Sequence, residues 1–194
     1  MNEMTVTPWR IYCGGPVTDF TESVFSLGNG ELGARGFSLR QKKRRPCDHA
    51  VFKAGLFEQI RPGITDMVQL PDVLRLSVAD GCEENVHQEL DMRRGALIHR
   101  FRAGRLEVES RRMVSMADSQ LLCVRLRATA LVEAEVEIDG AMDAEVCNLP
   151  VNDDQMTEET ETIRLLQTVR QSDSELVMRT ARGLADGGKA VVLV

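Results

Sequence analysis

The sequence predicts an all-β protein built from two packed antiparallel sheets. Apolar and polar residues alternate with a period of two along several segments, as expected for strands that bury one face. Helical periodicity does not extend over ten residues anywhere, and turn residues separate the alternating segments. With 194 residues, 43% hydrophobic and 28% charged, the chain can form a globular domain with a substantial core.

The first elements surround a glycine-rich stretch, Glu22–Gly36. A short strand is predicted over Pro8–Gly15, and Gly28–Gly30 forms a tight turn because Gly and Asn tolerate positive φ. Gly33 and Gly36 leave room for a close backbone approach or a bulge. Apolar residues lead into and out of the turn: Val24, Phe25, Leu32 and Ala34.

The same stretch contains a G-x-G-x-x-G pattern at Gly28–Gly33, which is also the fingerprint of dinucleotide sites. That fingerprint requires a helix directly after it. Residues 34–46 instead contain another glycine, no apolar period of 3.6 and a proline, which favours a β-turn. The basic run Gln41–Arg45 is predicted to be a solvated loop, with a localisation or phosphate-binding patch as the alternative.

Further strands follow. Ala54–Phe57 is too short to classify, whereas Val73–Val78 alternates as a half-buried strand that ends at Asp80–Gly81. Leu97–Arg102 and Arg105–Arg111 form a predicted hairpin with Ala103–Gly104 as its turn. This register pairs Phe101 with Leu106, His99 with Val108, and Arg100 with Glu107.

Leu122–Ala128 and Val132–Ile138 form a second predicted hairpin, folded near Ala130. Arg127 then faces Glu133, and Arg125 faces Glu135, so Glu133–Glu137 is a solvated sheet face and not a cluster of catalytic acids. Pro150–Glu159 is a polar loop, and the last predicted strands are Thr162–Arg170, Leu176–Ala181 and Ala190–Val194. Because the chain ends in an apolar strand, we expect it to be a piece of a longer protein, cut inside or at the edge of a sheet.

Composition excludes several classes of function. The net charge of −6 gives no electrostatic case for nucleic acid, and no apolar run is long enough for a transmembrane helix. The N-terminus lacks a signal-peptide pattern, so a cytoplasmic protein is expected. The cysteines are odd in number and lack C-x-x-C spacing, which predicts reduced thiols: Cys13, Cys47, Cys82, Cys123 and Cys147. His49, His87 and His99 lack ligand spacing, so we predict surface or edge histidines and no metal site.

Five blocks carry a resemblance to a known family. Glu22–Gly36 resembles the opening signature of glycoside hydrolase family 65, which holds maltose, trehalose and kojibiose phosphorylases and some α-glucoside hydrolases. The other blocks follow in the family's order: Ala54–Phe57, Val68–Leu76, Gln88–Leu97 and Val114–Asp118. The resemblance spans about Trp9 to Asn148, and more weakly continues to Gly183.

The resemblance implies a fold and a place in a larger enzyme. Residues 1–194 would be the N-terminal antiparallel β-supersandwich, of the galactose mutarotase-like type, and shorter than usual. The catalytic (α/α)6 barrel is absent, so no catalytic residue can be transferred to this chain. The parent enzyme would invert the anomeric carbon of an α-glucoside disaccharide, with inorganic phosphate as co-substrate in a phosphorylase and no other cofactor.

Asn29 and Arg35 are the candidate site residues, because the glycine turn can present them to the barrel domain or to the rim of its pocket. Turn geometry and a local ion pair are the alternative. The carboxylates of the family blocks are expected to pair with Arg35, Arg93 or Arg94: Glu22, Glu31, Glu89 and Asp91. The aromatic residues Trp9, Tyr12 and Phe57 are predicted to be buried in the core, with stacking on a sugar as the alternative.

The sequence therefore predicts a structural and interface domain of a family 65 enzyme in carbohydrate metabolism, inactive alone, with its own barrel domain as partner. Two alternatives stay open. The chain could be a stand-alone carbohydrate-binding or regulatory sandwich, or a dimerisation module.

Overall fold

The computed structural model describes residues 3–38, 48–61, 63–78, 81–148, 164–173, 175–180 and 190–193. The chain divides into two units, the first formed by Met1–Gln41 and Leu74–Ala141, the second by Lys42–Val73 and Met142–Val194. The chain passes between them within β7 (Asp72–Val78) and β12 (Ile138–Asp143), which form a two-stranded sheet. The predicted all-β, antiparallel class is confirmed.

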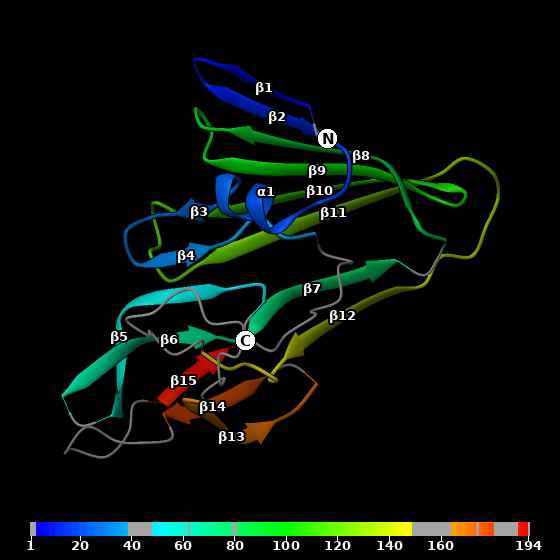
Figure 1. The fold of residues 1–194 in the computed structure, drawn as a ribbon. Coiled ribbons are helices and arrows are strands. Elements are labelled where there is room, and N and C mark those ends of the chain that lie inside the picture. Colours follow the sequence, from blue (N-terminus) through cyan, green and yellow to red (C-terminus); the bar gives the residue numbers. More distant parts are fainter. Residues whose placement is uncertain are drawn as a thin grey trace. The chain divides into compact units, whose positions relative to one another are not determined.

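A six-stranded antiparallel sheet forms the first unit, in the order β1-β2-β8-β9-β10-β11 (Figure 1). Its strands are β1 (Met4–Thr7), β2 (Arg10–Gly14), β8 (Glu83–Asp91), β9 (Ala96–Ala103), β10 (Leu106–Val114) and β11 (Leu122–Ala130). The alternation predicted from sequence is strongest in β10, where every second residue from Leu106 to Val114 is buried. These residues line the inner face of the sheet.

One helix and a small hairpin belong to the same unit. Helix α1 (Asp19–Val24) begins at Thr18, whose side chain accepts a hydrogen bond from the Thr21 backbone N–H, while the Thr21 side chain accepts one from the Thr18 N–H. This reciprocal cap stabilises the first turn. Sequence periodicity missed α1 because six residues are too few to show a period of 3.6. The chain then turns into a hairpin of β3 (Leu27–Gly28) and β4 (Leu32–Ala34), which confirms the predicted glycine turn.

The second unit contains a hairpin and a three-stranded sheet. β5 (Val51–Arg61) pairs with β6 (Ile64–Leu70), so Ala54–Phe57 lies within a strand. β13 (Leu166–Gln171), β14 (Leu176–Thr180) and β15 (Ala190–Leu193) form an antiparallel sheet with β14 in the middle. The three C-terminal strands were predicted, although the first begins later than expected. The basic run 41–45 and the loop 150–159 lie outside the described residues.

The hairpin of β9 and β10 is confirmed, but its predicted register is wrong by two residues. Val108 pairs with Phe101, and Arg100 pairs with Glu109 rather than with Glu107. The turn is Gly104–Arg105, and Gly104 has a φ of +54°. Ala103 is fully buried and belongs to β9, because it packs in the core cluster beside Leu106 and Val108.

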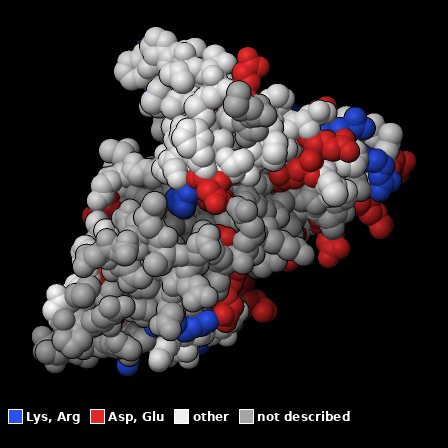
Figure 2. Space-filling view, in the orientation of Figure 1, with Lys and Arg blue, Asp and Glu red and all other residues white. Residues whose placement is uncertain are grey.

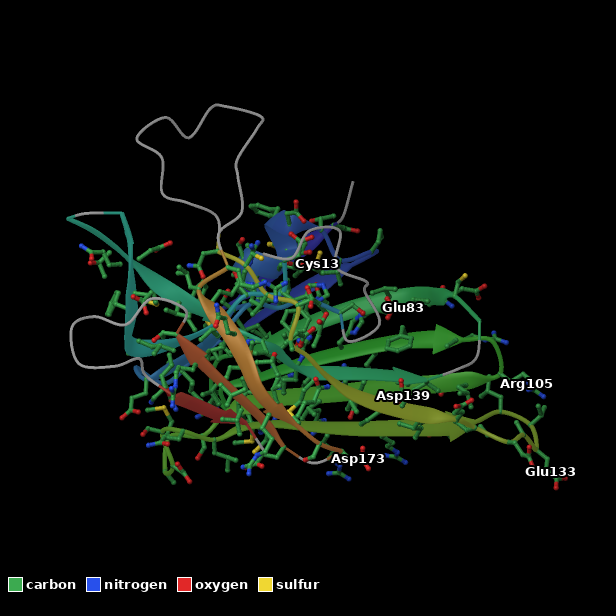
Figure 3. All side chains as sticks on the ribbon, turned by 90° about the horizontal axis from the view of Figure 1, so that it is seen from below. Cys13, Glu83, Arg105, Glu133, Asp139 and Asp173 are labelled. Atoms are coloured by element: carbon green, nitrogen blue, oxygen red, sulfur yellow. The ribbon has the colours of Figure 1, made fainter. Side chains whose placement is uncertain are left out.

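The second predicted hairpin is wrong. β11 pairs with β10, so Arg127 faces Glu109 and not Glu133. Residues 131–137 form no strand, and Val132 and Val136 are 55% and 37% exposed. The segment follows β11 and begins beside the β9–β10 turn, where the Leu131 N–H donates to the Arg105 carbonyl. Figure 3 shows Arg105 and Glu133 at the same end of the long strands, and Figure 2 shows acidic and basic side chains mixed there.

Candidate functional site

The glycine turn is fixed by the side chain of Asn29. Its Oδ1 accepts hydrogen bonds from the backbone N–H groups of Glu31 (3.0 Å) and Leu32 (2.8 Å). Its Nδ2 donates to the carbonyls of Ser115 (2.6 Å) and Ser119 (3.0 Å), in the turn between β10 and β11. Asn29 therefore joins the β3–β4 turn to the end of the six-stranded sheet. Gly30 supplies the positive φ of the turn, +92°.

Arg35 lies against helix α1. Its guanidinium donates to the Asp19 carbonyl (2.9 Å) and to the Ser23 hydroxyl (2.8 Å), and its Nε lies 3.8 Å from Oε2 of Glu22. The Glu22 side chain is 4% exposed, whereas that of Arg35 is 34% exposed. The expected pairing of Glu22 with Arg35 is confirmed, and the Arg35 side chain remains partly exposed to solvent.

Gly36 allows the end of the stretch to approach α1. A Cβ at this position would lie 2.5 Å from the Cβ and 2.6 Å from the carbonyl oxygen of Phe25. No real side chain tolerates such distances, so only glycine fits here without a backbone shift. The Gly36 N–H donates to the Glu22 carbonyl at 2.8 Å. The predicted close approach is thus confirmed at Gly36.

A row of polar side chains crosses the inner face of the six-stranded sheet beneath this stretch. Gln88 on β8 pairs with His99 on β9, and His99 pairs with Ser110 on β10. All three are buried, at 2%, 0% and 0% exposure. This polar row separates two apolar clusters, one around Phe101 and Leu106 and the other around Leu90 and Leu97.

One amide donor and one guanidinium donor on the inner face of the sheet bind the end of the glycine-rich stretch. Gln88 Nε2 donates to the Gly36 carbonyl at 2.9 Å. Arg112, next along the buried face of β10 and 2% exposed, donates to the Phe37 carbonyl, and its guanidinium carbon lies 4.9 Å from the centre of the Phe37 ring. Both side chains therefore fix the backbone of residues 36–37 on the sheet.

His99 is an uncharged imidazole in this row. Burial, and secondarily the charge of Arg112, lower its pKa from 6.5 to about 3. Neither its ring nitrogens nor the Ser110 hydroxyl has a hydrogen-bond partner among the described residues. The ring also packs against Phe101, with centroids 5.1 Å apart. Such a group disfavours protonation strongly, since a second positive charge would lie beside Arg112.

The prediction of surface or edge histidines is therefore wrong for two of the three. His99 lies in the polar row, and His49 in the second unit is 2% exposed with its Nδ1 3.1 Å from Oδ2 of Asp72. Only His87 is exposed. A signal for His99 was present, because the alternation of Leu97, His99 and Phe101 places the imidazole on the apolar face.

Two further carboxylates of the family blocks, Asp91 and Glu89, bind arginines. Asp91 contacts Arg94 at 3.1 Å and Arg10 at 3.6 Å, and Glu89 contacts Arg100 at 3.2 Å. Burial raises the pKa of Asp91, but hydrogen bonds from the Arg94 backbone and side chain, with the charge of Arg10, more than offset it and leave the pKa below its usual value. The expected pairing with Arg94 is confirmed for Asp91, whereas the prediction is wrong for Glu89, which pairs with Arg10 and Arg100.

The predicted burial of the aromatic residues is wrong for Trp9, which is 60% exposed, and for Phe57, which is 37% exposed. Tyr12 is partly buried and accepts a hydrogen bond from Arg10 at 3.1 Å. Trp9 lies outside the core because it occupies the turn between β1 and β2, where no second layer covers it among the residues described here.

The described ranges contain no group of three or more His, Cys, Asp or Glu side chains that could hold a metal ion. None of the four described cysteines forms a disulfide. The described part of the chain also has no helix long and apolar enough to cross a membrane.

The family model for the N-terminal domain of glycosyl hydrolase family 65 matches residues 18–190. Among solved structures, the chain is similar to "Putative kojibiose phosphorylase from human microbiome", with a TM-score of 0.66 and 14% sequence identity. The match covers 93% of this chain and 26% of that one, so this chain spans about a quarter of the length of the similar protein. Comparison with curated proteins gave no match.

Proposed function

The chain belongs to glycosyl hydrolase family 65, and on this premise we propose that it is the structural and interface domain of an α-glucoside phosphorylase or hydrolase, inactive alone. The observation that carries the proposal is the family match over residues 18–190, to a model of the N-terminal domain. The whole of residues 1–194 then serves as that domain, and its partner is the enzyme's own catalytic barrel.

The chemistry of two described carboxylates, Glu109 and Asp91, fits a domain that is inactive alone. Inverting cleavage of a glycoside needs a carboxylic acid whose pKa is raised, facing a second group across the sugar. In this chain Glu109 has a lowered pKa instead, through a hydrogen bond from Arg111 that outweighs its partial burial, with a further contribution from Arg100. Asp91 is likewise lowered. Both are suited to ion pairing rather than to proton donation.

Asn29 and Arg35 are proposed as interdomain or pocket-rim residues, with different roles. Asn29 uses both ends of its amide within the chain, so it would act by fixing the turn. Arg35 keeps part of its guanidinium exposed while α1 holds the rest, so it could donate directly to the barrel. The substrate would be an α-glucoside disaccharide, with inorganic phosphate as co-substrate in a phosphorylase.

The test compares the 194-residue chain alone with the enzyme that joins it to a family 65 barrel. Both are assayed for release of glucose or glucose 1-phosphate from maltose, trehalose and kojibiose, with and without phosphate. We expect activity only in the joined enzyme. Turnover by the chain alone would overturn the proposal.

Two observations favour other roles. The exposed Trp9 is compatible with carbohydrate binding by the isolated chain, which titration with maltose, trehalose and starch would detect. β1 is the end strand of its sheet and Val6 on it is 66% exposed, which favours a homodimer; light scattering showing a strict monomer would reject it.

The absence of disulfides among the described cysteines supports a reducing, cytoplasmic location.

A further inference from the structure

A hollow of about 590 Å³ lies where two turns of the six-stranded sheet meet. The β1–β2 turn contributes Thr7, Trp9 and Arg10, and the β8–β9 turn contributes Asp91, Arg93 and Arg94. We call it the Trp9 hollow. Its volume is within the range of small-molecule sites, ~300–1,000 Å³.

The indole of Trp9 forms an exposed face of this hollow on a fixed backbone. The side chain is 60% exposed, yet the Trp9 carbonyl accepts a hydrogen bond from the Met92 N–H at 2.9 Å. The Thr7 hydroxyl donates to the Arg10 carbonyl at 3.2 Å across the same turn. The two turns therefore fix each other's backbone at Trp9. An exposed aromatic ring on such a backbone is suited to stacking.

The charge of the Trp9 hollow is unbalanced. Three arginines line it with one carboxylate, Asp91, whose side chain is 2% exposed. Oδ2 of Asp91 contacts Arg94 at 3.1 Å and Arg10 at 3.6 Å, while Oδ1 accepts the Arg94 backbone N–H at 3.1 Å. The buried carboxylate thus orients two guanidinium groups. Arg93 makes no hydrogen bond or ion pair with any described residue, so its whole fork of donors is available.

This combination selects one ligand chemistry. Guanidinium donors greatly outnumber acceptors, which disfavours a neutral sugar because its hydroxyl groups need acceptors as well as donors. Phosphate matches the geometry of arginine forks. We propose that the Trp9 hollow binds a phosphate monoester whose ring stacks on Trp9, with the phosphate held by Arg93 and Arg94. Sugar phosphates and nucleoside monophosphates share this chemistry. The site does not depend on the proposed function of the domain.

The single tryptophan of the sequence makes the test direct, because all indole fluorescence reports on this hollow. Glucose 1-phosphate, AMP, glucose and inorganic phosphate are titrated separately into the 194-residue chain, with calorimetry as a second readout because AMP absorbs near the indole band. We expect saturable binding of glucose 1-phosphate or AMP, and the tighter of the two identifies the source. Glucose and inorganic phosphate should each bind at least about tenfold more weakly, since each lacks one half of the ligand.

Two variants and a matched control complete the experiment. Arg93→Ala removes no contact within the described structure and should weaken binding about tenfold or more, as expected for a charge-assisted hydrogen bond. Trp9→Ala, followed by calorimetry, should have a similar effect. Arg125→Ala removes the same charge from β11, the strand at the opposite edge of the sheet, and should leave the affinity unchanged. Failure of both phosphate esters to bind, equal binding of inorganic phosphate, or equal loss in Arg125→Ala would overturn the proposal.

Discussion

Replacing His99 by methionine should remove a large part of the acid sensitivity of this chain. His99 is 0% exposed, and burial together with Arg112 lowers its pKa from 6.5 to about 3. The groups that face it from the neighbouring strands are Gln88 and Ser110, with Arg112 as the nearby charge, so no described carboxylate is there to stabilise an imidazolium. Methionine has a similar volume and does not titrate.

The direction in which stability changes with pH depends on whether the folded or the unfolded chain binds the proton more readily. Below pH 6.5 the unfolded chain protonates His99, whereas the folded chain does so only near pH 3. The contribution of His99 to the free energy of unfolding is therefore fully present above pH 6.5. It falls by up to ~1.4 kcal/mol for each pH unit below that value. Between pH 8 and pH 5 the loss is about 2 kcal/mol.

Urea unfolding followed by circular dichroism at pH 8 and pH 5 measures this loss. The wild-type chain should lose about 2 kcal/mol more than His99→Met over this interval. His87→Met makes the same replacement at an exposed position and should behave as the wild type does. The range stops at pH 5 because the lowered carboxylates Asp91 and Glu109 titrate below it. Parallel pH dependence of the wild type and His99→Met would refute the reasoning.

Three further predictions concern the glycine-rich stretch, each checked by urea unfolding at pH 7.5. Gly36→Ala should cost about 1–3 kcal/mol, because the added Cβ meets Phe25; an unchanged midpoint would contradict the close approach. Asn29→Asp keeps the two acceptor bonds and loses both donor bonds to the β10–β11 turn, so about 1–3 kcal/mol is expected, with Asn29→Ala at least as severe. Arg35→Ala should cost less than about 1 kcal/mol, since its two hydrogen bonds are exposed and its distance to the buried Glu22 carboxylate is long, at 3.8 Å; a larger loss would show that Arg35 is a structural residue.

The hairpin of β9 and β10 shows which part of a fold a local pattern can determine. Alternation correctly assigned each residue to a face, and the face survived a register error because a shift of two preserves it. The register itself depends on which residue follows the last buried one. Ala103 was a plausible turn residue by composition, and only its packing in the cluster with Val78 and Leu106 places it in the strand.

The segment 132–138 shows the opposite case. Its alternation is as regular as that of β11, yet residues 131–137 form no strand and β11 pairs with β10. β10 carries Glu109 opposite both Arg100 and Arg127, so it offers β11 a charged partner of its own. The sequence contains two partners of equal quality for β11, and the choice between them is made by tertiary packing.

The glycine turn of the candidate site was predictable from the sequence, but the side chains that hold the stretch on the sheet were not. Glycine and asparagine chemistry predicted the hairpin, because these preferences are local. The polar side chains beneath it belong to three strands that are distant in sequence from the turn. Gln88 and Arg112 on these strands donate to the backbone carbonyls of residues 36–37, and backbone carbonyls leave no pattern in a sequence. Arg112 and Gln88 therefore give the glycine-rich stretch its position, while Gly36 removes the side chain that would prevent it.

Since both donors reach backbone atoms, replacing Phe37 by leucine should retain that position, whereas replacing Arg112 by methionine should lose it. Amide exchange at Gly36, whose N–H donates to the Glu22 carbonyl, distinguishes the two variants. Faster exchange in Arg112→Met alone is expected, and equal protection in both variants would show that Arg112 does not hold this position.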